Sequence, residues 1–134
     1  MKKELLIGCG SKWDKRLTCD GNDEWSNLTT LDYNAAHKPD MVWDLMSPEV
    51  LPQQWENEFD EIHAYEVLEH LGSQGDYRLF FRQFEAFWRV LKPGGVIVWV
   101  VADATNDGSE TGSSFEQALH FKRLGLNLLD TMIW

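Results

Sequence analysis

The chain has 134 residues, of which 43% are apolar, 13% aromatic and 25% charged, and its formal net charge is -10. This composition excludes an intrinsically disordered protein and predicts one globular domain over residues 1–134. The lysines and arginines are scattered, so the sequence does not support nucleic-acid binding through a basic surface, and it suits a neutral or cationic small ligand better. It contains neither a membrane-span-like apolar run nor a signal-peptide pattern, so we expect a cytoplasmic protein without a membrane partner.

Short apolar runs bounded by turn residues predict four strands in the first half of the chain. They are residues 4–10, which end in Gly-x-Gly, and residues 28–34, 41–45 and 59–67. Residues 11–27 show no helical period. Too few residues join the second run to the third for a helical crossover, so we expect an irregular loop there. Alternatively, one of these two runs is not part of the sheet.

The second half of the chain begins with its strongest helical pattern. Apolar side chains recur at helical spacing over residues 77–91, which predicts a helix whose aromatic stripe packs in the core. The segment Lys92-Pro93-Gly94-Gly95 ends this helix, because a proline and two glycines follow a cation in the last turn. Residues 96–101 are continuously apolar and predict a strand that is buried on both faces.

The remaining residues predict a loop, a helix and a final strand. We expect the loop over residues 102–112, the helix over residues 113–124 and the strand over residues 126–134. In that helix Phe115, Ala118 and Leu119 are expected to face the core. The alternation of strands and helices predicts an α/β fold with a Rossmann-like, mostly parallel sheet and helices on both faces.

In an open parallel sheet, ligands bind outside the carboxyl ends of the strands, near the switch in strand order. Glycines after the first strand would let a ligand approach the backbone closely. An acid at the end of the second strand, 24 residues after Gly8, is placed as in folds where it binds ribose hydroxyls. The residues at the four strand ends are Gly8, Cys9, Gly10, Asp32, Asp44, Tyr65 and Glu66. This set predicts a site for a nucleoside that carries a positive charge.

Each of these residues also has an ordinary structural interpretation. The glycines could form a plain β-turn, Asp32 and Asp44 could cap exposed turns, and Glu66 could begin a helix. The third glycine of the dinucleotide-binding pattern is replaced by Trp13, which disfavours a nicotinamide cofactor. His63 and His70 are seven residues apart, and no nearby cysteine or aspartate completes a ligand set with them, so we predict no metal site.

Five segments resemble class I S-adenosylmethionine-dependent methyltransferases, in the expected order over roughly residues 4–103. They are Leu5–Gly10 (LLIGCG), Leu31-Asp32, Asp44-Leu45, residues 59–71, which end in EVLEHL, and Leu91–Gly95 (LKPGG). The resemblance implies S-adenosyl-L-methionine as the cofactor and methyl transfer to an unidentified acceptor as the activity. It also implies a role for each site residue: Gly8, Cys9 and Gly10 under the methionine part, Asp32 on the ribose hydroxyls, Asp44 and Leu45 beside the adenine, and Tyr65 and Glu66 bordering the sulfonium.

The last third of the chain resembles a narrower group. Residues 95–105, 108–115 and 130–134 look like the part of DNA amino-methyltransferases that follows their catalytic motif. That motif is Asp or Asn, then Pro-Pro and an aromatic residue, and it does not occur in this chain, so DNA amino-methylation is not supported.

Methyltransferases of the first type usually have a seventh strand, and this chain stops at Trp134, before that strand could begin. We therefore expect a truncated or mosaic methyltransferase-like domain, with a non-catalytic cofactor-binding module as the alternative function. An unpaired edge at residues 131–134 would favour a dimer through strand pairing.

Overall fold

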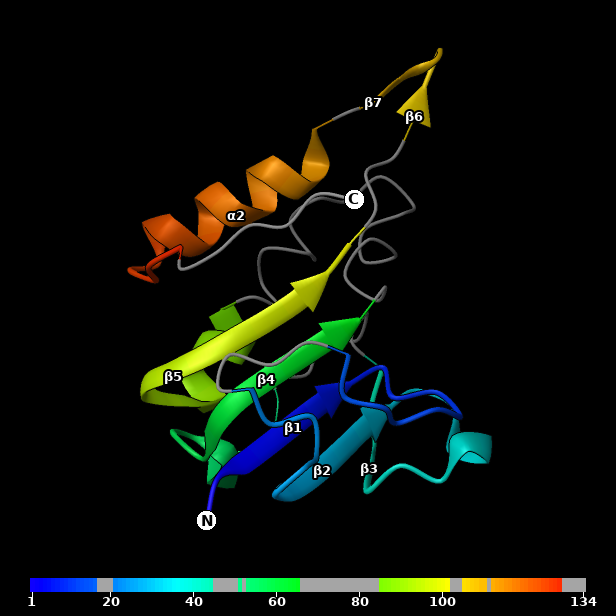
Figure 1. Ribbon diagram of the computed structural model, residues 1–134, viewed down its shortest axis with the longest axis vertical. Helices are drawn as coiled ribbons and strands as arrows, with labels where there is room; N and C mark the ends of the chain where they lie inside the picture. The colour runs from blue at the N-terminus through cyan, green and yellow to red at the C-terminus, as the bar shows by residue number, and fades with distance from the viewer. Residues whose placement is uncertain are drawn as a thin grey trace.

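The computed structural model describes residues 1–16, 21–44, 51, 53–65, 85–101, 105–110 and 112–128. Its centre is a five-stranded, all-parallel sheet with the strand order β3-β2-β1-β4-β5 (Figure 1). The strands are β1 (Lys3–Ile7), β2 (Asn27–Asp32), β3 (Met41–Val42), β4 (Phe59–Tyr65) and β5 (Leu91–Val100). The strand order reverses at β1, which pairs with β2 on one side and with β4 on the other. The predicted Rossmann-like α/β fold with a parallel sheet is confirmed, but the described helical segments pack on one face of the sheet and not on both.

The connection between β2 and β3 is irregular, as expected. It contains the single 3-10 turn η1 (Ala35–His37), and the Asn34 side chain caps this turn by accepting a hydrogen bond from the Ala36 N–H at 3.0 Å. Both flanking runs join the sheet, so the alternative that one of them lies outside it is wrong. A second 3-10 turn, η2 (Gln53–Trp55), precedes β4.

One face of the sheet carries the main apolar core. Successive side chains of a strand point to opposite faces, so Leu5 and Ile7 of β1 share this face with Ile62 and Ala64 of β4. Both described helical segments pack here: residues 85–90, and α2 (Ser113–Arg123), which lies beside β5 in Figure 1. Their contributions to this core are Ala86, Phe87, Val90 and Phe121.

The opposite face of β1 and β4 is smaller and more polar. Leu6, Cys9 and Tyr65 form its apolar cluster, and the ionisable side chains of Glu4 and His63 are buried beside them. Among the described residues, the connection between β1 and β2 covers this face, without a helix. This agrees with the lack of a helical period in residues 11–27.

The segment Lys92–Gly95 was predicted to follow the preceding helix as its end, but it lies within β5, which begins before the predicted strand at residues 96–101. Residues 96–101 are half-buried, not buried on both faces as predicted. The helix ends at Val90, and Leu91 already pairs with Phe59 of β4. The register then shifts, so that Val96 pairs with Glu61. A Cβ atom at Gly95 would lie 2.9 Å from the carbonyl oxygen of Asp60, so only glycine fits at this point of contact between β4 and β5.

The prediction for the inward face of α2 is wrong for Phe115 and Leu119, whereas Ala118 is half-buried. Phe115 and Leu119 are 55% and 51% exposed, whereas Gln117 and Phe121 are buried. The cause is a ring contact with the sheet, because the Phe121 and Trp99 ring centroids lie 4.8 Å apart. Two positions along a helix correspond to about 200° of rotation, so a helix that buries Phe121 must expose Leu119.

Residues 102–112 were expected to form a loop, but they contain a short hairpin. Its strands are β6 (Thr105–Asn106) and β7 (Ser109–Glu110), which pair antiparallel. Asp107 and Gly108 connect them with φ angles of 50° and 78°, the combination that favours tight hairpin turns.

Two further predictions fall partly or wholly outside the described residues. Residues 126–128 form no strand, and residues 129–134 are not described; the predicted helical residues 77–84 also lie outside the described part. No helix in the described residues is long and apolar enough to span a membrane.

Candidate functional site

The glycine loop, defined here as Gly8–Gly10, lies at the carboxyl end of β1 where the strand order reverses. Gly8 and Gly10 have φ angles of 63° and 57°, a region that glycine enters without strain. The Gly8 N–H donates to the Leu31 carbonyl at 2.8 Å, which extends the β1–β2 pairing into the loop. A Cβ atom at Gly10 would meet nothing within 4 Å, so the backbone is open to an approaching group.

Asp32 joins the glycine loop to the ends of β2 and β3. Its Oδ2 accepts the Gly10 N–H at 2.9 Å, and its Oδ1 accepts the Asn34 N–H at 2.8 Å. Its backbone carbonyl accepts the Trp43 N–H at 2.9 Å. Asp32 is 5% exposed, yet each of its carboxylate oxygens keeps a second acceptor position. The structure therefore brings Gly10 and Asp32 together, and the Asp32 carboxylate can still accept hydroxyl donors.

The other predicted site residues are placed less uniformly. Asp44 is exposed and follows β3 at the same edge of the sheet. Tyr65 ends β4, and its hydroxyl is turned back to His63 at 2.7 Å. Burial, followed by the nearby Asp32 charge, raises the pKa of the Cys9 thiol, so this cysteine is no activated nucleophile. Leu45 and Glu66 lie outside the described residues.

A buried ionic cluster on the polar face of β1 and β4 was not predicted. The β1–β4 cluster, as we call it, consists of Glu4, Lys15, Glu61, His63 and Tyr65. The Lys15 ammonium lies 2.6 Å from Glu4 Oε1 and 3.7 Å from Glu61 Oε2, and the Lys15 side chain is only 1% exposed. The two carboxylates share this buried cation because Glu4 and Glu61 are direct partners in the β1–β4 ladder.

His63 extends the cluster along β4. Its Nε2 lies 2.9 Å from Glu61 Oε2, and its Nδ1 lies 2.7 Å from the Tyr65 hydroxyl. A carboxylate can only accept, so we assign the imidazole proton to Nε2, and Nδ1 then accepts from the Tyr65 hydroxyl. Burial lowers the pKa of His63 and outweighs the opposing effect of Glu61, so the ring is neutral near pH 7.

The cluster also has the donor set of a metal site. Glu4, Glu61 and His63 each offer one ligand atom, and these atoms lie within 4.8 Å of one another. The Lys15 ammonium already supplies positive charge between the two carboxylates. The sequence signal that could have found part of this set is the alternation Glu61-x-His63-x-Tyr65, which places three polar side chains on one face of a strand.

The buried, neutral His63 predicts that acid destabilises the fold. Its folded-state pKa lies below the ordinary value of 6.5, so the unfolded chain binds the proton more readily. We expect the free energy of unfolding to fall as the pH drops through 6.5, until the folded-state pKa is reached. Urea unfolding at several pH values measures this, and His63→Gln should flatten the dependence in that range. An equally steep loss in His63→Gln would show that another group is responsible.

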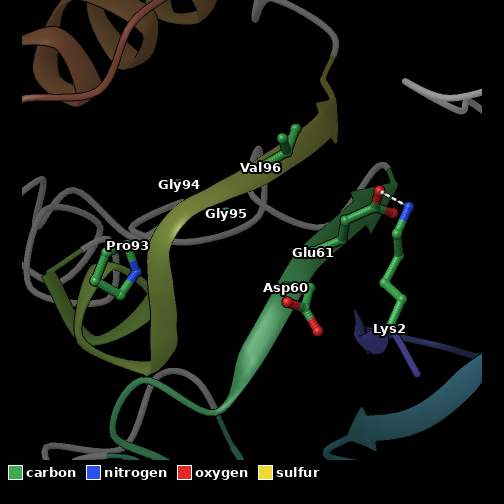
Figure 2. Close-up of a pocket in the computed structure, with 7 residues that line it drawn as sticks. All are labelled: Lys2, Asp60, Glu61, Pro93, Gly94, Gly95 and Val96. Carbon is green, nitrogen blue, oxygen red and sulfur yellow. Dashed lines mark hydrogen bonds and ion pairs between the residues drawn. The ribbon is translucent and has the colours of Figure 1, made fainter.

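Two cavities in the described part of the chain lie away from the glycine loop. The first, of about 310 Å³, lies at the amino ends of β1 and β4 beside the β5 irregularity, and Figure 2 shows the Lys2 side chain extending to Glu61, its hydrogen-bond partner. Its lining residues are Lys2, Asp60, Glu61, Pro93, Gly94, Gly95 and Val96. The second, of about 560 Å³, is open and is lined by Trp13, Asp14, Lys15, Asp23, Glu24 and Trp25. Neither is lined by Gly8, Gly10 or Asp32.

Comparison with known proteins gives one partial match. No family model matches the chain. A stretch of 50 residues is 66% identical to the orphan methyltransferase M.BamHII of Bacillus amyloliquefaciens, and it covers 37% of this chain. The same stretch is 19% of that protein, so the chain spans about a fifth of the length of the relative it matches. The match shows a partial relationship to a methyltransferase and supports a transferase role.

Proposed function

We propose that the chain is a methyltransferase domain of the class I type, which binds S-adenosyl-L-methionine at the carboxyl edge of β1 and β2. The observation that carries this proposal is the hydrogen bond from the Gly10 N–H to Asp32, made at the point where the strand order reverses. Open parallel α/β sheets bind their ligands at this position. The partial match to a methyltransferase gives independent support for the transfer reaction.

The residues at this edge fit such a cofactor. Asp32 would accept the ribose hydroxyls on its free acceptor positions, and the open backbone at Gly10 would allow the methionine part to lie close. Asp44 is exposed at the neighbouring strand end and would lie beside the adenine. When bound, the cofactor supplies a methyl group on a cationic sulfur, and the acidic chain favours a cationic ligand.

A binding experiment tests the proposal directly. Calorimetric titration of the folded chain with S-adenosylmethionine and with S-adenosylhomocysteine should give saturable binding to one site. Trp13 contacts the glycine loop, because its Nε1 donates to the Gly10 carbonyl at 2.9 Å, so tryptophan fluorescence should change during the titration. No binding of either compound at millimolar concentration would refute the proposal. Binding without methyl transfer to any acceptor would favour the non-catalytic alternative.

A further inference from the structure

The connection between β1 and β2 covers the polar face of the sheet with charges and rings. Parallel sheets in α/β proteins are covered on both faces, usually by helices. Here the Trp25 ring meets His63 edge-on, with centroids 5.0 Å apart, and the Arg16 guanidinium lies 5.3 Å from the Tyr65 ring. What fixes the described parts of this connection is therefore a set of specific polar contacts.

The buried Glu4 carboxylate contacts both ends of this connection. Glu4 Oε1 lies 2.6 Å from the ammonium of Lys15, in the part of the connection that leaves β1. Glu4 Oε2 accepts the N–H of Ser26, directly before β2, at 2.8 Å. Both the Glu4 and the Lys15 side chains are shielded from water. If the Lys15 ammonium moved away from Glu4, the buried Glu4 carboxylate would be left without a compensating charge. Because this is costly, the ion pair fixes the position of Lys15.

Lys15 and the glycine loop belong to the same part of the connection, the one that leaves β1. Trp13 lies between them, and its indole N–H donates to the Gly10 carbonyl. The Trp25 indole N–H in turn donates to the Trp13 carbonyl, and the Lys15 ammonium lies 5.3 Å from the Trp25 ring. A continuous path of contacts thus joins the buried ion pair to Gly10, and Gly10 donates to Asp32.

We propose that Lys15 is a positioning residue of the cofactor site. Its ion pair with Glu4 holds Trp13 against Gly10, and Trp13 keeps the Gly10 N–H on Asp32. This inference rests on the proposed function, because the glycine loop that Lys15 positions is the loop assigned there to the cofactor. It places one determinant of cofactor affinity on β1, at Glu4, away from the loop itself.

The test compares three variants of the whole chain. Lys15→Met removes the ammonium, Lys15→Met with Glu4→Gln removes both charges, and Lys3→Met is the control. The control removes the Lys3 ammonium, whose partner is Glu58. Both of these side chains are in contact with water, unlike those of Lys15 and Glu4. Two quantities are measured: amide hydrogen exchange at Gly10 by NMR without ligand, and the Kd for S-adenosylmethionine.

We expect faster Gly10 exchange and about a tenfold higher Kd in both Lys15 variants, in the range found for coupled residues of one network. The control should match the wild type in both quantities. The double variant leaves no unpaired buried charge, so its unfolding midpoint should recover relative to Lys15→Met. Its Gly10 exchange and its Kd should not recover, which separates positioning from stability.

Different results would overturn the two proposals separately. Wild-type Gly10 exchange in the double variant would refute the positioning role, whatever binds at the site. Faster exchange with an unchanged Kd would refute the link between Lys15 and cofactor affinity. A wild-type chain that binds no S-adenosylmethionine would overturn the proposed function, while the exchange measurement would still decide whether Lys15 holds the loop.

Discussion

Replacing Asp32 with asparagine is expected to weaken S-adenosylmethionine binding by about a hundredfold, which is about 2.7 kcal/mol. The reason is the number of contacts that its carboxylate serves. Each oxygen already accepts one backbone N–H, from Gly10 or from Asn34, and each would also accept a ribose hydroxyl. Hydrogen bonds to a charged acceptor contribute about 1.5–3 kcal/mol each. The asparagine amide would also point N–H groups at a backbone N–H.

The control for this prediction is Asp107→Asn. Asp107 is an exposed aspartate in the β6–β7 turn, and asparagine tolerates its φ of 50°. We expect this variant to bind the cofactor like the wild type. Titration with both S-adenosylmethionine and S-adenosylhomocysteine then separates two roles of Asp32. Equal weakening of both ligands indicates ribose contacts, and weakening of the charged ligand alone would contradict the ribose assignment.

The sheet could be predicted because its strands are coded locally. Short apolar runs with turn residues after them mark β1, β2 and β4, and the Gly8 backbone conformation ends β1 at Ile7. The carboxyl ends of parallel strands meet at one edge of the sheet, so the meeting of Gly10 with Asp32 at that edge was also accessible. The extent of β3 was not, because nothing in the apolar run over residues 41–45 indicates that only Met41 and Val42 pair with β2.

The β1–β4 cluster could not be predicted because its members are brought together by the fold. Glu4 and Glu61 lie far apart along the chain and meet only through the β1–β4 register. Lys15 stands in a segment without periodicity, and nothing local indicates that its ammonium is buried between them. A lysine in a polar loop is usually solvated, so composition alone points away from this role.

The orientation of α2 was misjudged for a related reason. Phe115 and Leu119 are four residues apart and look like the inward face of an amphipathic helix. In the fold, contact with Trp99 selects Phe121 instead, and Gln117 is buried on the same side. Helical spacing identifies a possible apolar face, but the neighbouring ring on β5 decides which side of the helix is covered.

A matched pair of phenylalanine substitutions tests this assignment. Phe87→Ala is expected to lower the free energy of unfolding by about 3–5 kcal/mol, because Phe87 is fully buried in the main core. Phe115→Ala is expected to change it by no more than about 0.5 kcal/mol, because more than half of that side chain is in water. Both residues stand in helical segments, so the gain in helix propensity from alanine is shared and cancels in the comparison.

Urea unfolding followed by far-UV circular dichroism measures both values. If the two substitutions cost the same, Phe115 packs in the core as helical spacing suggests, and the orientation of α2 described here is wrong. If only Phe87→Ala is costly, the Phe121–Trp99 contact sets the orientation, and Phe121→Ala should then also be costly. Because these side chains lie on the face of the sheet opposite Lys15, their loss should lower stability without changing the Gly10 exchange rate relative to the rest of the sheet.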